Sequence, residues 1–255
     1  MTRIKQMRRI GFIGSDNIDI VLYLARMGTY EKNTVAILDM TKDKDVLSTL
    51  YCGVCELPES NYYKNIYITS NESEKELEEV EYLFIYFGYN TEGYDFDKLD
   101  NIIISTEVIP TSAARLSKIR LPEEKGICSN ESADLEDVGE NTKESDQEST
   151  NEKDNNENRN SIDKRTVAIV RNAIGVKYKA KTLLEYSGRK YSKSQIFVLP
   201  YNELDYKNKC YLCIDNTVKL RKLSAEMKSL LYELHTIVYQ STVKTREFNK
   251  MIRKA

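Results

Sequence analysis

The sequence has no apolar run long enough to cross a membrane, because none of its uninterrupted apolar stretches approaches 18 residues. The basic start of the chain is followed by an apolar run only as long as a strand, and no small-residue cleavage pattern comes after it, so we expect no secretory signal. Five cysteines are an odd number, and a chain of 255 residues does not need disulfides to fold. These absences predict a reduced, cytoplasmic protein.

Histidine is scarce as well, since His235 is the only one in the chain. It follows Leu234 in an apolar-periodic segment, and neither a second histidine nor a candidate nucleophile is paired with it in the sequence. General base catalysis with an activated nucleophile needs such a partner, so we expect no catalytic role for His235.

Charge is abundant but unevenly placed. Residues 129–163 carry 12 acidic and 3 basic side chains, whereas the whole chain has a net charge of −2, so the rest of the chain sums to +7. Such a polar segment buries too little apolar surface to offset the entropy of ordering, and we expect a disordered loop at about 126–163 inside a single domain, 1–255. It is either a partner tether or neutral low-complexity sequence. The basic body is too mildly charged, and too poor in aromatic residues among its cations, to predict a nucleic-acid partner.

Short, nearly continuous apolar runs predict strands that are buried on both faces. They lie at 9–14, 34–40, 65–69, 81–87, 101–106, 166–171 and 195–200. Helix-like segments separate them, at 18–27, 111–120 and 178–188, and the longest helix is expected to begin near Lys219. Gly28 is expected to end the first helix. This alternation predicts an α/β fold with a mainly parallel sheet flanked by helices.

The turn between the first strand and the first helix reads Gly14, Ser15, Asp16, Asn17, Ile18, Asp19. The amino end of a helix offers N–H groups to an anion, as in phosphate-binding loops. This turn, however, contains no lysine, and Asp16 and Asp19 would repel a phosphate.

Two CxxC pairs, Cys52 with Cys55 and Cys210 with Cys213, are the candidate metal ligands. Paired thiolates are typical of tetrahedral zinc sites, but the interval between these pairs is far longer than in a zinc ribbon. The alternatives are a shared metal site, if the sheet brings the pairs together, and unrelated thiols.

The order of these segments resembles the MinD/ParA family of deviant Walker ATPases, a P-loop NTPase-like family with a three-layer fold, and within it the TadZ/CpaE branch of Flp/Tad pilus assembly. The matching stretches are 8–27 (first strand, phosphate loop and helix), 33–41, 79–90, 101–119, 166–172 and 197–202. The resemblance implies a degenerate nucleotide site formed by Gly14, Ser15, Asp16, Asn17, Asp39 and Asn172.

The same resemblance implies that hydrolysis is lost. The family's loop lysines are missing, Tyr86 or Phe87 stands at the Walker B aspartate, and Thr41 replaces the aspartate that follows Asp39. We therefore expect a pseudoATPase that binds no cofactor and serves as a scaffold or positioning protein in a bacterial pilus or secretion assembly. Its expected partners are proteins, including a second copy of the chain.

Residues 240–255 form a basic, amphipathic C-terminal segment, which predicts a weak contact with the inner face of the membrane. The alternative function is that of a Rossmann-type protein binding a dinucleotide or another small molecule, with Asp39 on a ribose hydroxyl. Strand order separates the two, because the MinD-like fold places the first strand beside the Tyr86 strand and the dinucleotide fold places it beside the Asp39 strand.

Overall fold

The computed structural model describes residues 6–14, 17–51, 60–119, 121, 165–173, 180–185, 187, 191–215 and 218–254. The loop expected at about 126–163 lies outside the described residues, as do Ser15, Asp16, Cys52 and Cys55. The strands are β1 (Arg8–Gly14), β2 (Val35–Asp39), β3 (Ser60–Tyr63), β4 (Ile66–Thr69), β5 (Tyr82–Gly88), β6 (Asn101–Glu107), β7 (Thr166–Arg171) and β8 (Ile196–Leu199). The helices are α1 (Ile18–Tyr30), α2 (Asp45–Leu50), α3 (Pro110–Ser117), α4 (Ala180–Glu185), α5 (Glu203–Asp215), α6 (Ala225–Tyr239) and α7 (Thr245–Lys254). Short 3₁₀ turns lie at η1 (Lys75–Glu79), η2 (Phe96–Lys98), η3 (Lys193–Gln195) and η4 (Leu220–Lys222).

The strands form one 8-stranded sheet in the order β3-β4-β2-β5-β1-β6-β7-β8. Its neighbouring strands run parallel except for the antiparallel β3–β4 pair at one edge. The expected mainly parallel α/β sheet is thus confirmed, and β3 is a strand that the sequence pattern did not reveal.

The first strand lies between β5 and β6, with Phe12 in register with Tyr86 and Gly14 in register with Ser105. The strand that carries Asp39 pairs with β5 instead of β1. This order is the one expected for a P-loop NTPase-like fold, whereas the dinucleotide-binding fold pairs its first two strands. The strand order therefore disagrees with the Rossmann-type alternative.

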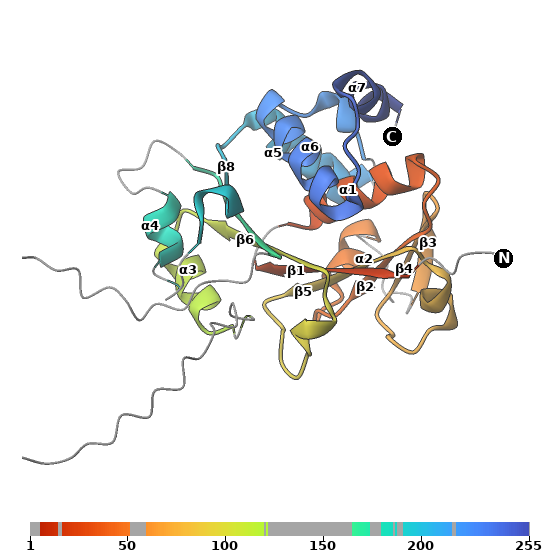
Figure 1. Cartoon of the computed structure of the whole chain (residues 1–255), viewed down its shortest axis with the longest axis horizontal. Coiled ribbons are helices and arrows are strands. Elements are labelled where there is room, and N and C mark those ends of the chain that lie inside the picture. The colour runs from red at the N-terminus through yellow and green to blue at the C-terminus, as the bar shows by residue number, and fades with distance from the viewer. Residues whose placement is uncertain are drawn as a thin grey trace, which may run out of the picture.

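Helices cover both faces of the sheet and make three layers (Figure 1). One core packs α1, α2, α6 and α7 on one face, and the other packs α3 and α4 on the opposite face. Because the central strands are covered twice, their residues are apolar without alternation, and β5 is buried along its whole length.

The first helix is buried on nearly every side, as its apolar sequence predicts, and it continues past Gly28 to Tyr30. The expectation that Gly28 ends the helix is therefore wrong. Glycine is needed there for another reason, because a Cβ at residue 28 would meet the hydroxyl of Tyr239. That hydroxyl donates a hydrogen bond of 2.8 Å to the Leu24 carbonyl, so the last turn of α6 is fixed against α1.

The C-terminal helix α7 turns its apolar residues Phe248, Met251 and Ile252 into the core. The side chains that the sequence offers to a membrane surface thus pack inside the protein, and Lys250 and Arg253 remain on the outer face. Among the described helices, none is long and apolar enough to span a membrane.

Replacing Phe248 by alanine tests whether α7 is part of the core. Its ring lies 5.0 Å from the Tyr232 ring, centroid to centroid, and the side chain is buried. We expect F248A to lower the free energy of unfolding by about 3 kcal/mol, measured by urea denaturation. The exposed K250A variant on the same helix should change it by less than about 0.5 kcal/mol. Equal, small effects of both variants would mean that α7 does not pack as described.

Candidate functional site

The carboxyl end of β1 and the amino end of α1 form the turn where a phosphate loop would lie. Gly14 ends β1 with a φ of 98°, a conformation that disfavours side chains. A Cβ at this position would also meet the Ser105 carbonyl oxygen in β6. Sheet packing alone therefore requires this glycine, whether or not a phosphate binds.

Asn17 occupies the N-cap position of α1 and is fully buried, yet its side chain makes no capping hydrogen bond. Its amide nitrogen donates to the Ile13 carbonyl at 3.4 Å. Its Oδ1 is buried and has no hydrogen-bond partner within the described part of the chain, and the same holds for the Ser105 hydroxyl. An amide oxygen cannot donate to a phosphate oxygen, so Asn17 in this orientation does not form an anion site.

A buried ion pair, which the sequence did not reveal, holds this turn in place. Arg171 ends β7, and its guanidinium donates to both carboxylate oxygens of Asp19 in the first turn of α1, at 2.6 and 2.8 Å. The Asp19 carboxylate also accepts the Ile20 backbone N–H at 2.9 Å. Both side chains are buried, with 7% of Arg171 and 1% of Asp19 exposed.

The pair places an internal carboxylate at the amino end of α1. Burial is the largest single influence and by itself would lower the pKa of Arg171, but the charge and hydrogen bonds of Asp19, with smaller contributions from Tyr23 and Glu107, together raise the pKa above its ordinary value. The expectation that Asp19 repels a phosphate needs correction, because Arg171 neutralises its charge. The effect on an anion is nevertheless unfavourable, since Asp19 already uses the Ile20 N–H and the arginine that an anion would need.

Asp39 ends β2 and is buried, and its carboxylate is engaged within the protein. One oxygen accepts hydrogen bonds from the backbone N–H groups of Val46 and Leu47, at 2.7 and 3.4 Å, at the start of α2. The other accepts from the hydroxyl and N–H of Thr41, at 2.6 and 3.1 Å. Burial raises the pKa of Asp39, although these hydrogen bonds oppose the shift. Asp39 thus caps α2, and a ribose or a metal ion would compete with these donors.

Asn172 follows Arg171 directly, in a left-handed conformation with a φ of 54°. Its side-chain amide donates to Glu107 at the end of β6, at 3.1 Å. The strand order β1-β6-β7 therefore gathers Gly14, Asn17 and Asn172 at one edge of the sheet. Asp39 lies on the other side of β1, separated from it by β5. Whether these residues contact a nucleotide stays a prediction.

The end of β5 carries no carboxylate. Tyr86 and Phe87 are both buried, Tyr86 in the core that contains α1 and Phe87 in the opposite core against Tyr94. Burial, followed by the charges of Asp45 and Asp39, raises the pKa of Tyr86, so this phenol stays neutral. Neither side chain offers an ionised oxygen to a metal ion.

The CxxC pair in the described part of the chain, Cys210 and Cys213, lies within α5, and neither cysteine takes part in a disulfide. Within the described residues there is no group of three or more histidine, cysteine or acidic side chains that could hold a metal ion. Because the other pair lies outside those residues, a meeting of the two pairs stays untested.

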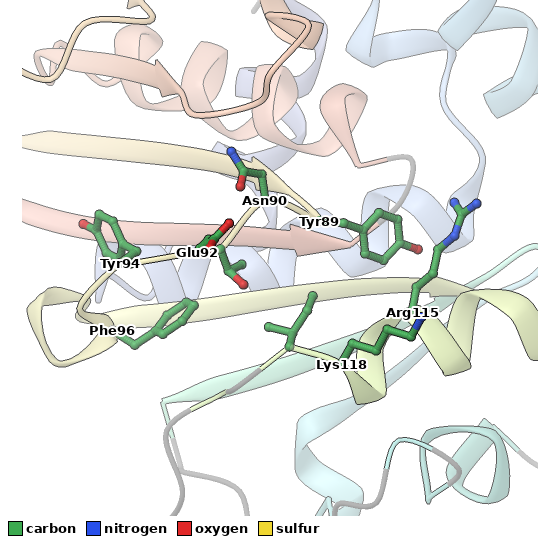
Figure 2. Close-up of a pocket in the computed structure, with 10 residues that line it drawn as sticks. Tyr89, Asn90, Glu92, Tyr94, Phe96, Arg115 and Lys118 are labelled. Atoms are coloured by element: carbon green, nitrogen blue, oxygen red, sulfur yellow. The ribbon is translucent and has the colours of Figure 1, made fainter.

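A cavity of about 1010 Å³ opens between the loop after β5 and α3 (Figure 2). Aromatic residues Tyr94 and Phe96 lie on one side of it, and Arg115 reaches over the Tyr89 ring on the other, 5.6 Å from the ring centre. Its charged side chains, Glu92, Arg115 and Lys118, are exposed and of both signs. Nothing in this lining selects one class of ligand.

Single and paired substitutions test the Asp19–Arg171 interaction. Removing one partner leaves an uncompensated buried charge, so we expect R171M to lower the free energy of unfolding by about 3–5 kcal/mol. The double variant D19L/R171M removes both charges and should recover most of that loss. Urea denaturation of the two single variants and the double variant measures the coupling. Additive losses would contradict a direct interaction.

The role of Asp39 as the cap of α2 predicts an effect on stability. D39A leaves the Val46 and Leu47 N–H groups without their acceptor, and we expect a loss of about 1–2 kcal/mol in the free energy of unfolding. D39N, which keeps one acceptor oxygen, should lose less. Thermal unfolding of both variants measures this order, and an unchanged D39A protein would contradict the capping role.

No protein-family model and no curated protein sequence matches the chain. Among solved structures, the crystal structure of a ParA family ATPase from Chlorobium tepidum TLS matches over 97% of this chain and 96% of that one, with a TM-score of 0.48 and 11% identity. The fold described above therefore rests on the strand order and layers of this chain itself.

Proposed function

We propose that the chain is a MinD/ParA-like protein that has lost nucleotide hydrolysis and acts as a scaffold or positioning protein. The observation that carries the proposal is the Asp19–Arg171 pair, because it supplies from within the protein both the negative charge and the arginine contact at the amino end of α1. Phosphoryl transfer depends on cations and N–H groups that are free to stabilise the transferring group.

Three further features support the loss of hydrolysis. The Asp39 carboxylate already accepts hydrogen bonds from Thr41 and from the start of α2. Tyr86 occupies the position where a metal-coordinating aspartate would be needed. The sequence has no lysine between residues 6 and 31, so the turn after β1 offers none to the phosphates. These residues do not fit a nucleotide with its Mg²⁺.

The finer part of the proposal is the process. The resemblance of the sequence to the TadZ/CpaE branch supports a role in a bacterial Flp/Tad-type pilus or secretion assembly, with protein partners. The outer face of α7, with its basic residues Arg246, Lys250, Arg253 and Lys254, would provide a purely electrostatic contact with an anionic membrane surface, since the apolar face is buried.

The proposal is tested by titrating ATP and ADP into the full-length protein in a calorimeter, with and without Mg²⁺. We expect no binding heat and no phosphate release above buffer, because Arg171 is already paired with Asp19 and the turn after β1 has no lysine. A thermal-unfolding scan gives an independent readout. A nucleotide at 100 times its Kd would stabilise the protein by about 2.7 kcal/mol, and we expect no stabilisation.

Mg²⁺-dependent turnover above background would overturn the proposal outright. Binding without turnover would overturn the claim that Asp19 takes the place of the anion. Nucleotide binding to D19L/R171M would then show whether the site includes Arg171, since this variant removes the arginine while keeping the packing.

A further inference from the structure

Helix α5 buries two polar side chains and exposes several apolar ones, unlike an ordinary surface helix. Asp205 and Asn208 are buried on its inner side, where they serve the next segment of the chain. Asp205 accepts hydrogen bonds from the N–H and the hydroxyl of Ser224, at 2.8 and 2.5 Å, at the start of α6. Asn208 donates to the Lys222 carbonyl at 2.8 Å. These polar contacts position α5 together with buried Leu212, while Leu204, Tyr211 and Ile214 remain outside.

The outer side of α5 carries Leu204, Tyr211 and Ile214, which are 55%, 44% and 74% exposed. With Lys207 they are spaced three, four and three residues apart, the interval at which one helix face meets another helix. We call these four residues the α5 stripe. Exposed apolar residues scattered singly are ordinary, but a continuous stripe at this spacing marks a contact surface. In Figure 1, α5 lies in the helical layer with α6, on the α1 side of the sheet.

We propose that the α5 stripe binds the same stripe of a second copy of this chain, with the two helices antiparallel about a two-fold axis. The stripe can pair with the same stripe of a second copy because its four positions are symmetric about residue 209. In the antiparallel register Leu204 faces Ile214 of the second copy, and Lys207 faces Tyr211. Every contact therefore occurs twice, as a two-fold interface requires.

The Lys207–Tyr211 contact complements charge as well as shape. The Tyr211 ring already accepts a cation within the chain, since the Lys219 ammonium lies 4.9 Å from its centre. Lys207 reaches from the same helix and is held by Glu203 at 2.7 Å. A cation over an aromatic face is favourable, and Glu203 keeps the charge of Lys207 paired at the interface.

The α5 stripe by itself is smaller than a standard protein–protein interface. A helix of 13 residues is about 20 Å long, too short to bury about 800 Å² on each partner. Exposed Val198, Tyr201 and Tyr206 enlarge the apolar surface near the Leu204 end of α5, and the rings of Tyr201 and Tyr206 lie 6.2 Å apart. Small interfaces are typical of transient association, so we expect a weak, reversible dimer with a dissociation constant in the micromolar range.

Sedimentation equilibrium of the full-length protein between about 1 and 100 µM covers this range. We expect wild type to be a reversible dimer and Ile214→Asp to raise the dissociation constant at least about tenfold, because both copies lose an apolar contact. Ile214 is mostly exposed in one chain, so the substitution should not disturb folding. The matched control is Tyr62→Asp, another exposed side chain, 64% accessible, on the edge strand β3.

The register itself is tested by crosslinking. Cys210 lies one residue from the centre of symmetry, so the two copies of Cys210 are offset by about 3 Å along the helix axes in the dimer. The two copies of Cys213 are offset by about 12 Å. A short bis-maleimide should crosslink the wild-type dimer. C210S should abolish most of that product and C213S should not.

A monomer throughout the concentration range would overturn the proposal and leave the stripe to a different chain. A dimer that Ile214→Asp does not weaken, or a crosslink that survives C210S, would place self-association elsewhere on the protein.

Discussion

The buried ion pair between Asp19 and Arg171 is the constraint on which the carboxyl edge of the sheet depends. It joins the first helix to the seventh strand across 152 residues of sequence, and both charges are out of contact with water. Such a pair contributes little net stability, but neither partner can remain without the other. The turn after β1, the end of β7 and the start of α1 therefore keep one relative position. A ligand that needed Arg171 would have to leave Asp19 unpaired.

Acidic residues do the same structural work at three helix starts. Asp19 accepts an N–H group in the first turn of α1, Asp39 caps α2 from the end of a strand, and Asp205 fixes the start of α6. Each places a negative charge at the positive end of a helix dipole, where it satisfies backbone donors. The sequence alone indicates a repelling charge at Asp19 and a candidate ligand at Asp39, and in the structure both carboxylates lie at helix boundaries.

The strands could be predicted because double burial makes them apolar without interruption, as in "VAILD" and "YLFIYFG". The edge strand β3, "SNYY", could not be recognised by its apolar sequence because its residues are at most half-buried. The α5 helix escapes for the opposite reason, since its buried face holds Asp205 and Asn208, and periodicity analysis expects apolar residues there. Arg171 shows the limit for the site: an arginine at the end of an apolar strand suggests a special contact, but no local pattern reveals that its partner is Asp19.

The contact between Tyr239 and α1 links the packing of the first helix to a segment that is synthesised much later. The Tyr239 hydroxyl binds the Leu24 carbonyl, a separation of 215 residues, and the faces of α1 that the sheet does not cover are closed by α6 and α7. During synthesis α1 leaves the ribosome well before α6 and α7, which cover it in the native fold. Until those two helices follow, this apolar helix lacks part of its native cover. The native packing of α1 therefore depends on contacts that form only after α6 and α7 have been synthesised.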